Sequence, residues 1–283
     1  MRLGFNMLLW TTHVSTDHSP TFEALKGAGY DGVEIPLFEG DVAHFETVGK
    51  RLAELELGVT TVTVMPPGKN CISADAAERE AGLGHLQWAI ECTNALGGEL
   101  VAGPFHQPLA EFSGTGPTAD EVSRCVEVHA KAAAFAAERN IKLSVEPLNR
   151  FECYFLNTAE QAASLVRKVG AENYGYLYDT FHLNIEENDP IGVIAKTASC
   201  INHVHISENT RGTPGDGHID FHGTIAALVD AGYDGWLTVE AFGSALPDLA
   251  AATKIWRTMF ERPEDVHDGA IRTMRAGVSA ARG

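Results

Sequence analysis

The chain of 283 residues contains few cysteines, no long apolar run and no excess of basic residues. Its five cysteines form an odd number, and none stands in a Cys-x-x-Cys pair, which favours reduced thiols over a disulfide framework. No stretch approaches the ~18 consecutive apolar residues of a membrane span, and the amino-terminal apolar run is too short for a signal peptide. These absences predict a cytoplasmic protein without a membrane partner.

The charge balance is strongly acidic. The chain has 21 lysines and arginines against 38 aspartates and glutamates, a formal net charge of −17 at pH 7. Such a charge repels phosphate backbones, and no local run of basic residues compensates for it. We therefore expect no nucleic-acid partner.

Strand-like and helix-like patterns alternate along the whole chain. Strands are predicted at residues 3–10, 30–36, 59–65, 100–102, 141–145, 174–178, 201–206 and 236–239. A first helix is predicted to begin near residue 19 and to stop at Gly27-Ala28-Gly29. Further helices are predicted at residues 41–57, 75–96, 118–139, 158–169, 191–198, 221–231, 246–260 and 265–281. Eight such units without a linker predict an α/β fold, a single (β/α)8 TIM barrel of residues 1–283 in which the helices within 246–281 close the barrel.

Four of the predicted strands lead to a residue that can bind a metal ion. The four residues are Glu146, Asp179, His205 and Glu240, separated by 33, 26 and 35 residues. A strand–helix unit of an eight-unit barrel has about 31 residues, and these steps are close to that length. The four side chains should therefore converge on one rim of the barrel. A single carboxylate at a strand end is more often a helix cap or an ion-pair partner, and it is the fourfold spacing that favours a metal.

The composition of this set indicates which cation fits. Two glutamates, one aspartate and one histidine suit one divalent ion, Mn²⁺ first, with Co²⁺ or Mg²⁺ as alternatives, whereas a structural zinc site usually has thiolates. Without a cation, the converging carboxylates would repel one another.

His203 and His205 lie two residues apart on one predicted strand, so both side chains point to the same side. Because ligands in a barrel come from the carboxyl ends of strands, His205 is the expected ligand. His203 is expected one layer below, as an orienting or packing residue.

The residues around the four predicted ligands form recognisable motifs. These are Glu146-Pro-Leu-Asn149-Arg150-Phe151-Glu152, Asp179-Thr180-Phe181-His182, His203-Val-His205 followed by Arg211 and a glycine-rich loop, and Glu240. From about residue 140 to 242 this pattern resembles the D-tagatose 3-epimerase group of ketose 3-epimerases, which belong to the xylose-isomerase-like barrels.

The resemblance implies an isomerase of carbohydrate metabolism that epimerises free ketoses at C3, such as D-tagatose, D-fructose, D-psicose or L-ribulose, through a cis-enediolate. It implies that Glu146 and Glu240 bind the metal and also serve as the catalytic acid–base pair. Glu152, His182 and Arg211 would hold the O1 to O3 region of the sugar. We further expect a homo-oligomer, either a dimer or a tetramer.

The amino-terminal half matches the resemblance less closely. The side chains that it offers for C4 to C6 of the sugar are Asn6, Trp10, His13, Met65, Phe105 and His106. No glycine-rich phosphate loop joins a strand to a helix, which favours an unphosphorylated substrate.

Several other functions keep the same barrel. Three alternatives keep the barrel and the metal but catalyse a different reaction: an aldose–ketose isomerase, a hydroxypyruvate isomerase and an inosose dehydratase. A metal-dependent endonuclease would need a basic groove, against which the charge of −17 counts. A non-catalytic sugar-binding barrel would keep the ligand set only as structure.

Overall fold

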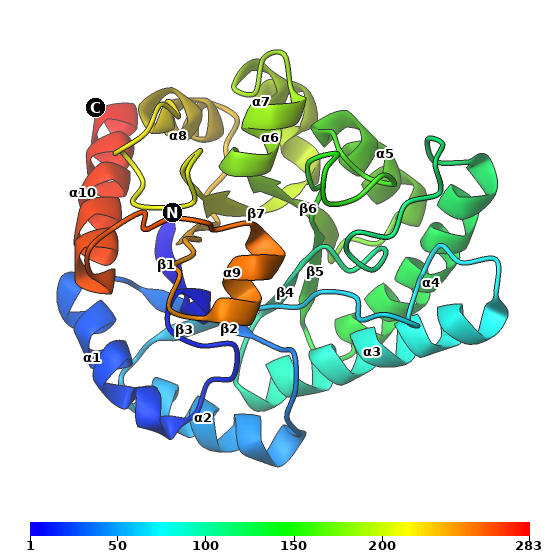
Figure 1. Cartoon of the computed structure of the whole chain (residues 1–283), viewed down its shortest axis with the longest axis horizontal. Helices are drawn as coiled ribbons and strands as arrows, with labels where there is room; N and C mark the ends of the chain where they lie inside the picture. Colours follow the sequence, from blue (N-terminus) through cyan, green and yellow to red (C-terminus); the bar gives the residue numbers. More distant parts are fainter.

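The computed structural model describes all 283 residues, and its eight strands close into one parallel barrel (Figure 1). The strands are β1 (Arg2–Asn6), β2 (Gly32–Pro36), β3 (Gly58–Val62), β4 (Leu100–Gly103), β5 (Lys142–Val145), β6 (Tyr174–Asp179), β7 (Ile201–Ile206) and β8 (Trp236–Val239). Each strand pairs in parallel with the next, and β8 closes against β1 with Phe5 opposite Val239. The predicted (β/α)8 barrel is confirmed.

Most of the helices surround the barrel as an outer ring, whereas the short helix α9 (Pro247–Thr253) lies over the strands (Figure 1). The helices are α1 (Ser19–Ala28), α2 (Val42–Glu54), α3 (Ala76–Ala95), α4 (Ala119–Ala137), α5 (Ala159–Val169), α6 (Thr180–Glu186), α7 (Gly192–Thr197), α8 (Phe221–Asp230), α9 (Pro247–Thr253) and α10 (Pro263–Arg282). Short 3-10 turns lie at η1 (Met7–Leu9), η2 (Thr16–His18) and η3 (Ala198–Cys200). No helix combines the length and the apolar character that crossing a membrane requires.

Local sequence signals explain where the helices begin and end. Thr118 and Glu121 form a capping box at the start of α4, in which each side chain bonds the backbone N–H of the other residue. Gly170 ends α5 in the left-handed conformation that glycine adopts without steric cost. The apolar faces of these helices pack on the barrel and form one large continuous core.

Several predicted boundaries differ from the structure. The first strand ends at Asn6 instead of residue 10, because the Asn6 side chain accepts a hydrogen bond from the Leu8 N–H and starts a 3-10 turn. The third strand ends at Val62 instead of residue 65. The helix predicted at 246–260 covers only Pro247–Thr253, since Lys254 adopts a left-handed conformation that terminates α9.

The helix α6 was not predicted. It begins directly after Asp179, whose side chain accepts hydrogen bonds from the N–H groups of Phe181 and His182. The residue at the end of β6 is therefore also the N-cap of a helix.

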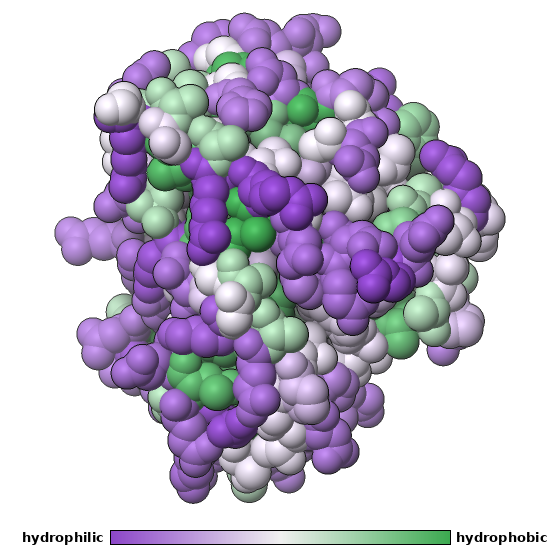
Figure 2. Space-filling view, turned by 90° about the vertical axis from the view of Figure 1, so that its left-hand side faces the viewer, coloured by the Kyte–Doolittle hydropathy of each residue, from purple (hydrophilic) through white to green (hydrophobic).

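The side of the molecule that carries α1, α8 and α10 is mostly polar, with small separate apolar patches (Figure 2). This face is on the flank of the barrel. The residues that carry the predicted chemistry lie instead at the carboxyl ends of the strands.

Candidate active site

Four strands deliver the predicted ligand residues to one point of the rim. Asp179 is the last residue of β6 and His205 the penultimate residue of β7, while Glu146 and Glu240 directly follow β5 and β8. The backbone N–H groups of Glu146 and Glu240 continue the sheet by bonding the carbonyls of Gly103 (3.0 Å) and Ile206 (3.3 Å). One potential ligand atom from each of the four residues lies within 4.8 Å of the others, and all four residues are buried.

The orientation of His205 is fixed by Glu34. His205 Nε2 lies 2.7 Å from Glu34 Oε1, so this nitrogen carries a hydrogen and donates it. The other ring nitrogen, Nδ1, faces Asp179 Oδ2 at 3.5 Å and Glu240 Oε1 at 3.6 Å. Nδ1 is buried and has no hydrogen-bond partner.

Glu34, in the middle of β2, was not among the predicted site residues. Its fully buried carboxylate also accepts hydrogen bonds from His203 Nε2 (2.8 Å), Asn6 Nδ2 (2.9 Å) and Thr60 Oγ1 (3.0 Å). Burial alone would raise the pKa of Glu34, but the two imidazoles hold it well below its usual value. The sequence signal that could have indicated Glu34 is a carboxylate flanked by apolar residues, Val33 and Ile35, within a predicted strand.

His203 lies outside the four-residue cluster. Its ring packs edge-on against that of His205, with the centroids 5.2 Å apart, and its Nε2 binds Glu34. The position agrees with the predicted orienting layer beneath the ligand residues.

The cluster is electrostatically crowded in the absence of a cation. Burial and the neighbouring Glu240 raise the pKa of Glu146 well above its usual value. Burial, reinforced by the charge of Asp179, raises the pKa of Glu240 to about 7 despite opposition from His205. Burial also opposes ionisation of Asp179, yet the neighbouring imidazoles of His205 and His182 lower its pKa to about 2.

These features fit a divalent cation. The buried His205 Nδ1, which has no hydrogen-bond partner, faces carboxylate oxygens, and burial together with neighbouring carboxylates raises the pKa values of Glu146 and Glu240. A bound cation would offset both effects. The carboxylate of Glu34 on the far nitrogen of His205 is the usual outer partner of a metal-binding histidine.

The three predicted substrate contacts form a second group beside the cluster. Arg211 Nη2 donates to Glu152 Oε1 (3.2 Å) and lies 3.0 Å from His182 Nε2, which is 3.7 Å from Glu146 Oε1. The backbone N–H of Asn149 donates to His182 Nδ1 (3.0 Å), so donors from Asn149 and Arg211 face the two ring nitrogens. Burial lowers the pKa of His182 to about 4, which keeps the ring neutral.

A cavity of about 160 Å³ opens above this arrangement. Its polar wall is made of Glu146, Glu152, His182, Arg211 and Glu240. Its apolar wall is made of Leu8, Phe38, Val62, Val64, Pro104, Leu109, Leu148, Phe242, Leu249 and Ala252, with Thr253 at the edge. A small cavity lined by both ionisable and apolar residues suits a small polar ligand.

None of the amino-terminal residues expected at C4 to C6 of the sugar lines this cavity. Trp10 packs on Phe5, and His13 stacks on His44. Met65 lines a different hollow, Phe105 and His106 are buried within the fold, and Asn6 bonds Glu34 and Glu240 beneath the site. The apolar wall comes from neighbouring positions and from α9, which the motifs did not indicate.

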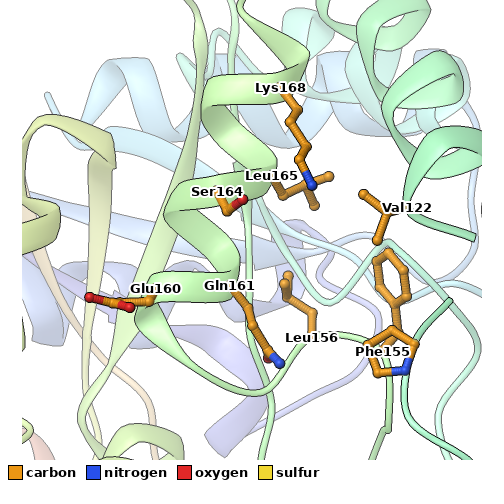
Figure 3. Close-up of a pocket in the computed structure, with 9 residues that line it drawn as sticks. Val122, Phe155, Leu156, Glu160, Gln161, Ser164, Leu165 and Lys168 are labelled. Carbon is orange, nitrogen blue, oxygen red and sulfur yellow. The ribbon is translucent and has the colours of Figure 1, made fainter. Parts of the chain in front are cut away.

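A second cavity, of about 270 Å³, lies on the outside of the barrel between α4 and α5 (Figure 3). Val122 comes from α4, Leu165 and Lys168 come from α5, and Phe155 closes the space between them. It shares no residue with the cluster at the rim, so it does not belong to this site.

Fold and site together define a TIM-barrel protein with an acidic and histidine-containing centre at its carboxyl-terminal rim. The family model described as Xylose isomerase-like TIM barrel matches residues 22–269, and the chain belongs to this family.

Relatives within the family narrow the assignment. The L-ribulose 3-epimerase of Mesorhizobium japonicum is 34% identical over 92% of this chain and 88% of its own, and the ketose 3-epimerase of Arthrobacter globiformis is 30% identical over 100% and 98%. A solved structure of L-ribulose 3-epimerase has a TM-score of 0.91 at 32% identity, covering 99% of this chain and 95% of that one. The protein is thus an enzyme of the isomerase class related to ketose 3-epimerases, as the motifs predicted.

Proposed function

We propose that this protein epimerises free ketoses at C3. In this proposal one divalent ion is held by Glu146, Asp179, His205 and Glu240. Mn²⁺ is the first candidate for this ion, and Co²⁺ and Mg²⁺ are the alternatives. The observation that carries the proposal is the unpartnered Nδ1 of His205, which faces two carboxylates beneath a sugar-sized cavity. Relatives named L-ribulose 3-epimerase and D-psicose 3-epimerase support ketoses as the substrate class.

When bound, the cation acts as a Lewis acid for negative charge that develops beside the substrate carbonyl. Glu146 and Glu240 divide the proton transfers: one carboxylate removes the proton from C3, and the other, protonated, returns one to the opposite face of the cis-enediolate. The direction of the reaction decides which residue plays which part.

Arg211, His182 and Glu152 orient the substrate in this proposal. The ring of His182 and the guanidinium of Arg211 line the same wall of the cavity, where Arg211 donates to sugar oxygens. Glu152 bonds Arg211 and supplies an acceptor for a sugar hydroxyl. The apolar wall excludes water from the reacting carbon atoms.

The proton transfer can be followed with an isotope. Incubation of fructose, tagatose or psicose with the Mn²⁺-loaded enzyme in deuterated water should place deuterium at C3 of the epimer and leave C1 unlabelled. An aldose–ketose isomerase would instead exchange hydrogen between C1 and C2 and release an aldose. NMR of the product separates the two outcomes, and label at C1 would overturn the epimerase assignment.

Single Glu146→Gln and Glu240→Gln variants test the acid–base pair. Each should lose at least about 10²–10⁴ in kcat, because an amide neither takes nor returns the proton and both residues also hold the metal. Glu160→Gln, at the outer cavity between α4 and α5, is the matched control and should keep wild-type kcat. Steady-state rates on one ketose check this, and near-normal rates in either site variant would contradict the assigned roles.

A further inference from the structure

The loop that follows β7 is organised around a buried carboxylate, that of Glu208. Its Oε1 accepts hydrogen bonds from the N–H groups of Asn209 (3.0 Å) and Ile219 (3.2 Å), and its Oε2 accepts one from Gly215 (2.9 Å). Glu208 is 0% exposed and has no basic side chain within ion-pair distance. Bonds from backbone N–H groups to a carboxylate are charge-assisted, so this one side chain ties the beginning, middle and end of loop 209–219 together.

This loop carries Arg211 in an unusual backbone conformation. Arg211 has φ of 58°, in the left-handed region that non-glycine residues occupy only when their surroundings enforce it. Its N–H donates to the Glu208 carbonyl (2.8 Å), and its own carbonyl accepts from the Phe242 N–H (2.8 Å). The backbone of Arg211 is therefore held between Glu208 and the segment after β8.

The guanidinium of Arg211 reaches the cavity from this backbone, and its Nη2 contacts Glu152 and His182 there. It lies 4.1 Å over the Phe181 ring and 5.0 Å from the Phe242 ring, and its Nε is buried without a hydrogen-bond partner. Its only ion pair is the 3.2 Å contact with Glu152. A shift of the loop would therefore move the charged group in the cavity.

We infer that Glu208 is a positioning residue: by closing loop 209–219, it fixes the place of the Arg211 guanidinium in the cavity. The inference rests on the proposed function, in which Arg211 binds the ketose. Gly217 supports the same arrangement, because a Cβ at this position would stand 2.4 Å from Glu208 Oε1 and displace the carboxylate.

The variant Glu208→Gln tests the role with little change in volume. Both carboxylate oxygens of Glu208 accept hydrogen bonds from backbone N–H groups. Whichever way the glutamine amide is turned, its NH₂ group therefore faces a backbone N–H, and two donors oppose each other. We expect kcat/KM for a free ketose to fall by about 10- to 100-fold, as for a displaced binding group. Mn²⁺ affinity should stay within about twofold, because Glu208 does not touch the four proposed ligands.

A double-mutant cycle with Arg211→Ala distinguishes positioning from general support of the fold. If Glu208 acts through Arg211, adding Glu208→Gln to Arg211→Ala should change kcat/KM by less than about twofold. Fully additive losses would overturn the inference. Glu187→Gln is the matched control, since Glu187 accepts one backbone N–H from Ala159 but lines no part of the cavity, and it should leave kcat/KM unchanged.

Hydrogen exchange gives a readout that does not depend on turnover. In Glu208→Gln, the N–H groups of Gly215 and Ile219 should exchange faster than in the wild type, whereas exchange in β7 should be unchanged. Unaltered exchange in the loop would refute the inference even if the enzyme epimerises ketoses. A wild-type protein without ketose turnover would refute the proposed function instead, while the exchange experiment would still report on Glu208.

Discussion

The surroundings of Nδ1 separate His205 from His203. In both residues Nε2 binds Glu34 and Nδ1 is buried without a hydrogen-bond partner, but only the Nδ1 of His205 faces carboxylates, those of Asp179 and Glu240. Removing His205 deletes a proposed ligand. Removing His203 leaves Glu34 Oε2 with its bond from Thr60 and leaves the bond to His205 intact.

We therefore expect His205→Ala to lose more than about 100-fold in Mn²⁺ affinity, more than the usual loss for an outer partner of a ligand. His203→Ala should keep Mn²⁺ affinity within about tenfold and should lower the free energy of unfolding by ~2 kcal/mol or more, because it opens a buried space. Calorimetric titration with Mn²⁺ and denaturant unfolding measure the two quantities. Equal loss of affinity in both variants would contradict the distinction.

The charge state of the cluster predicts a pH dependence of metal binding. Burial would lower the pKa of His205, but the carboxylates of Glu34 and Glu240 outweigh it and raise that pKa well above the usual value. In the metal-free protein His205 is therefore protonated at neutral pH, and Glu240, with a pKa of about 7, is partly protonated. A cation must displace these protons before it can bind to the same atoms.

The apparent Mn²⁺ affinity should accordingly rise with pH, by about tenfold or more per unit between pH 6 and 7. Titrations in buffers of different ionisation enthalpy should also detect proton release on binding. The Glu240→Gln variant, which has no proton to lose at this position, should show a shallower dependence. An affinity that is independent of pH over this range would argue against the assigned protonation states.

The sequence alone led to the four cluster residues but not to Glu34, for a physical reason. Glu146 and Asp179 stand where a strand pattern stops, and strand ends of a barrel meet at one rim. Glu34 lies inside β2, and its partner His205 is 171 residues away in the chain. Hydrogen bonds between distant strands depend on barrel closure, which local patterns do not describe.

At the scale of elements, the periodic patterns did not predict the short helix α6 at the rim or the contribution of α9 to the cavity wall. In α6, the N-cap Asp179 has two tasks: its Oδ1 holds the first turn, and its Oδ2 accepts from Ser207 Oγ (3.1 Å) and faces His205. Long outer helices such as α3 and α4 were predicted to within two residues of their ends, because caps and apolar spacing define them.

The helix α9 forms part of the cavity wall and gives a test at this scale. Ala252 lines the cavity, and an indole at this position would occupy much of its ~160 Å³. We expect Ala252→Trp to raise KM by at least about tenfold, the usual discrimination for misfit in a pocket, with Mn²⁺ affinity unchanged.

Ala251→Trp is the matched control for this variant. Ala251 and Ala252 are both exposed on this helix, but only Ala252 lines the cavity, so replacing Ala251 should leave KM near the wild-type value. Kinetics of both variants on one free ketose decide the matter. A similar rise of KM in both would mean that disturbance of α9, and not filling of the cavity, is responsible.

For the whole molecule, alternation of strand and helix was sufficient to predict the barrel, because eight units of this length close in only one common way. The shape of the cavity could not be predicted in the same way. Its wall joins Leu8, near the start of the chain, to Leu249 near the end, and both pack in a small cluster separate from the main core. The cytoplasmic location and the homo-oligomer stay predictions.

The charge of the molecule and of its cavity bears on the form of the substrate. The net charge is −17, and Arg211 is the only basic residue with a side chain in the cavity wall, where it is already paired with Glu152. A phosphate group carries about −1.5 to −2 charges at pH 7 and needs several donors. Against the apolar wall of Leu8, Phe38 and Leu249, a phosphate group would lose its bound water without gaining hydrogen-bond donors in exchange.

We therefore expect kcat/KM for fructose 6-phosphate to be at least about 100-fold below that for fructose, since a buried charge without donors costs ~3 kcal/mol or more. Both rates should be measured at the same free Mn²⁺ concentration by NMR of the C3 epimers. Fructose with an equal concentration of inorganic phosphate is the control, because phosphate can withdraw Mn²⁺ from the enzyme without entering the cavity. A preference for the phosphorylated sugar would mean that donors outside the described wall reach the substrate, and the assignment to free ketoses would then be wrong.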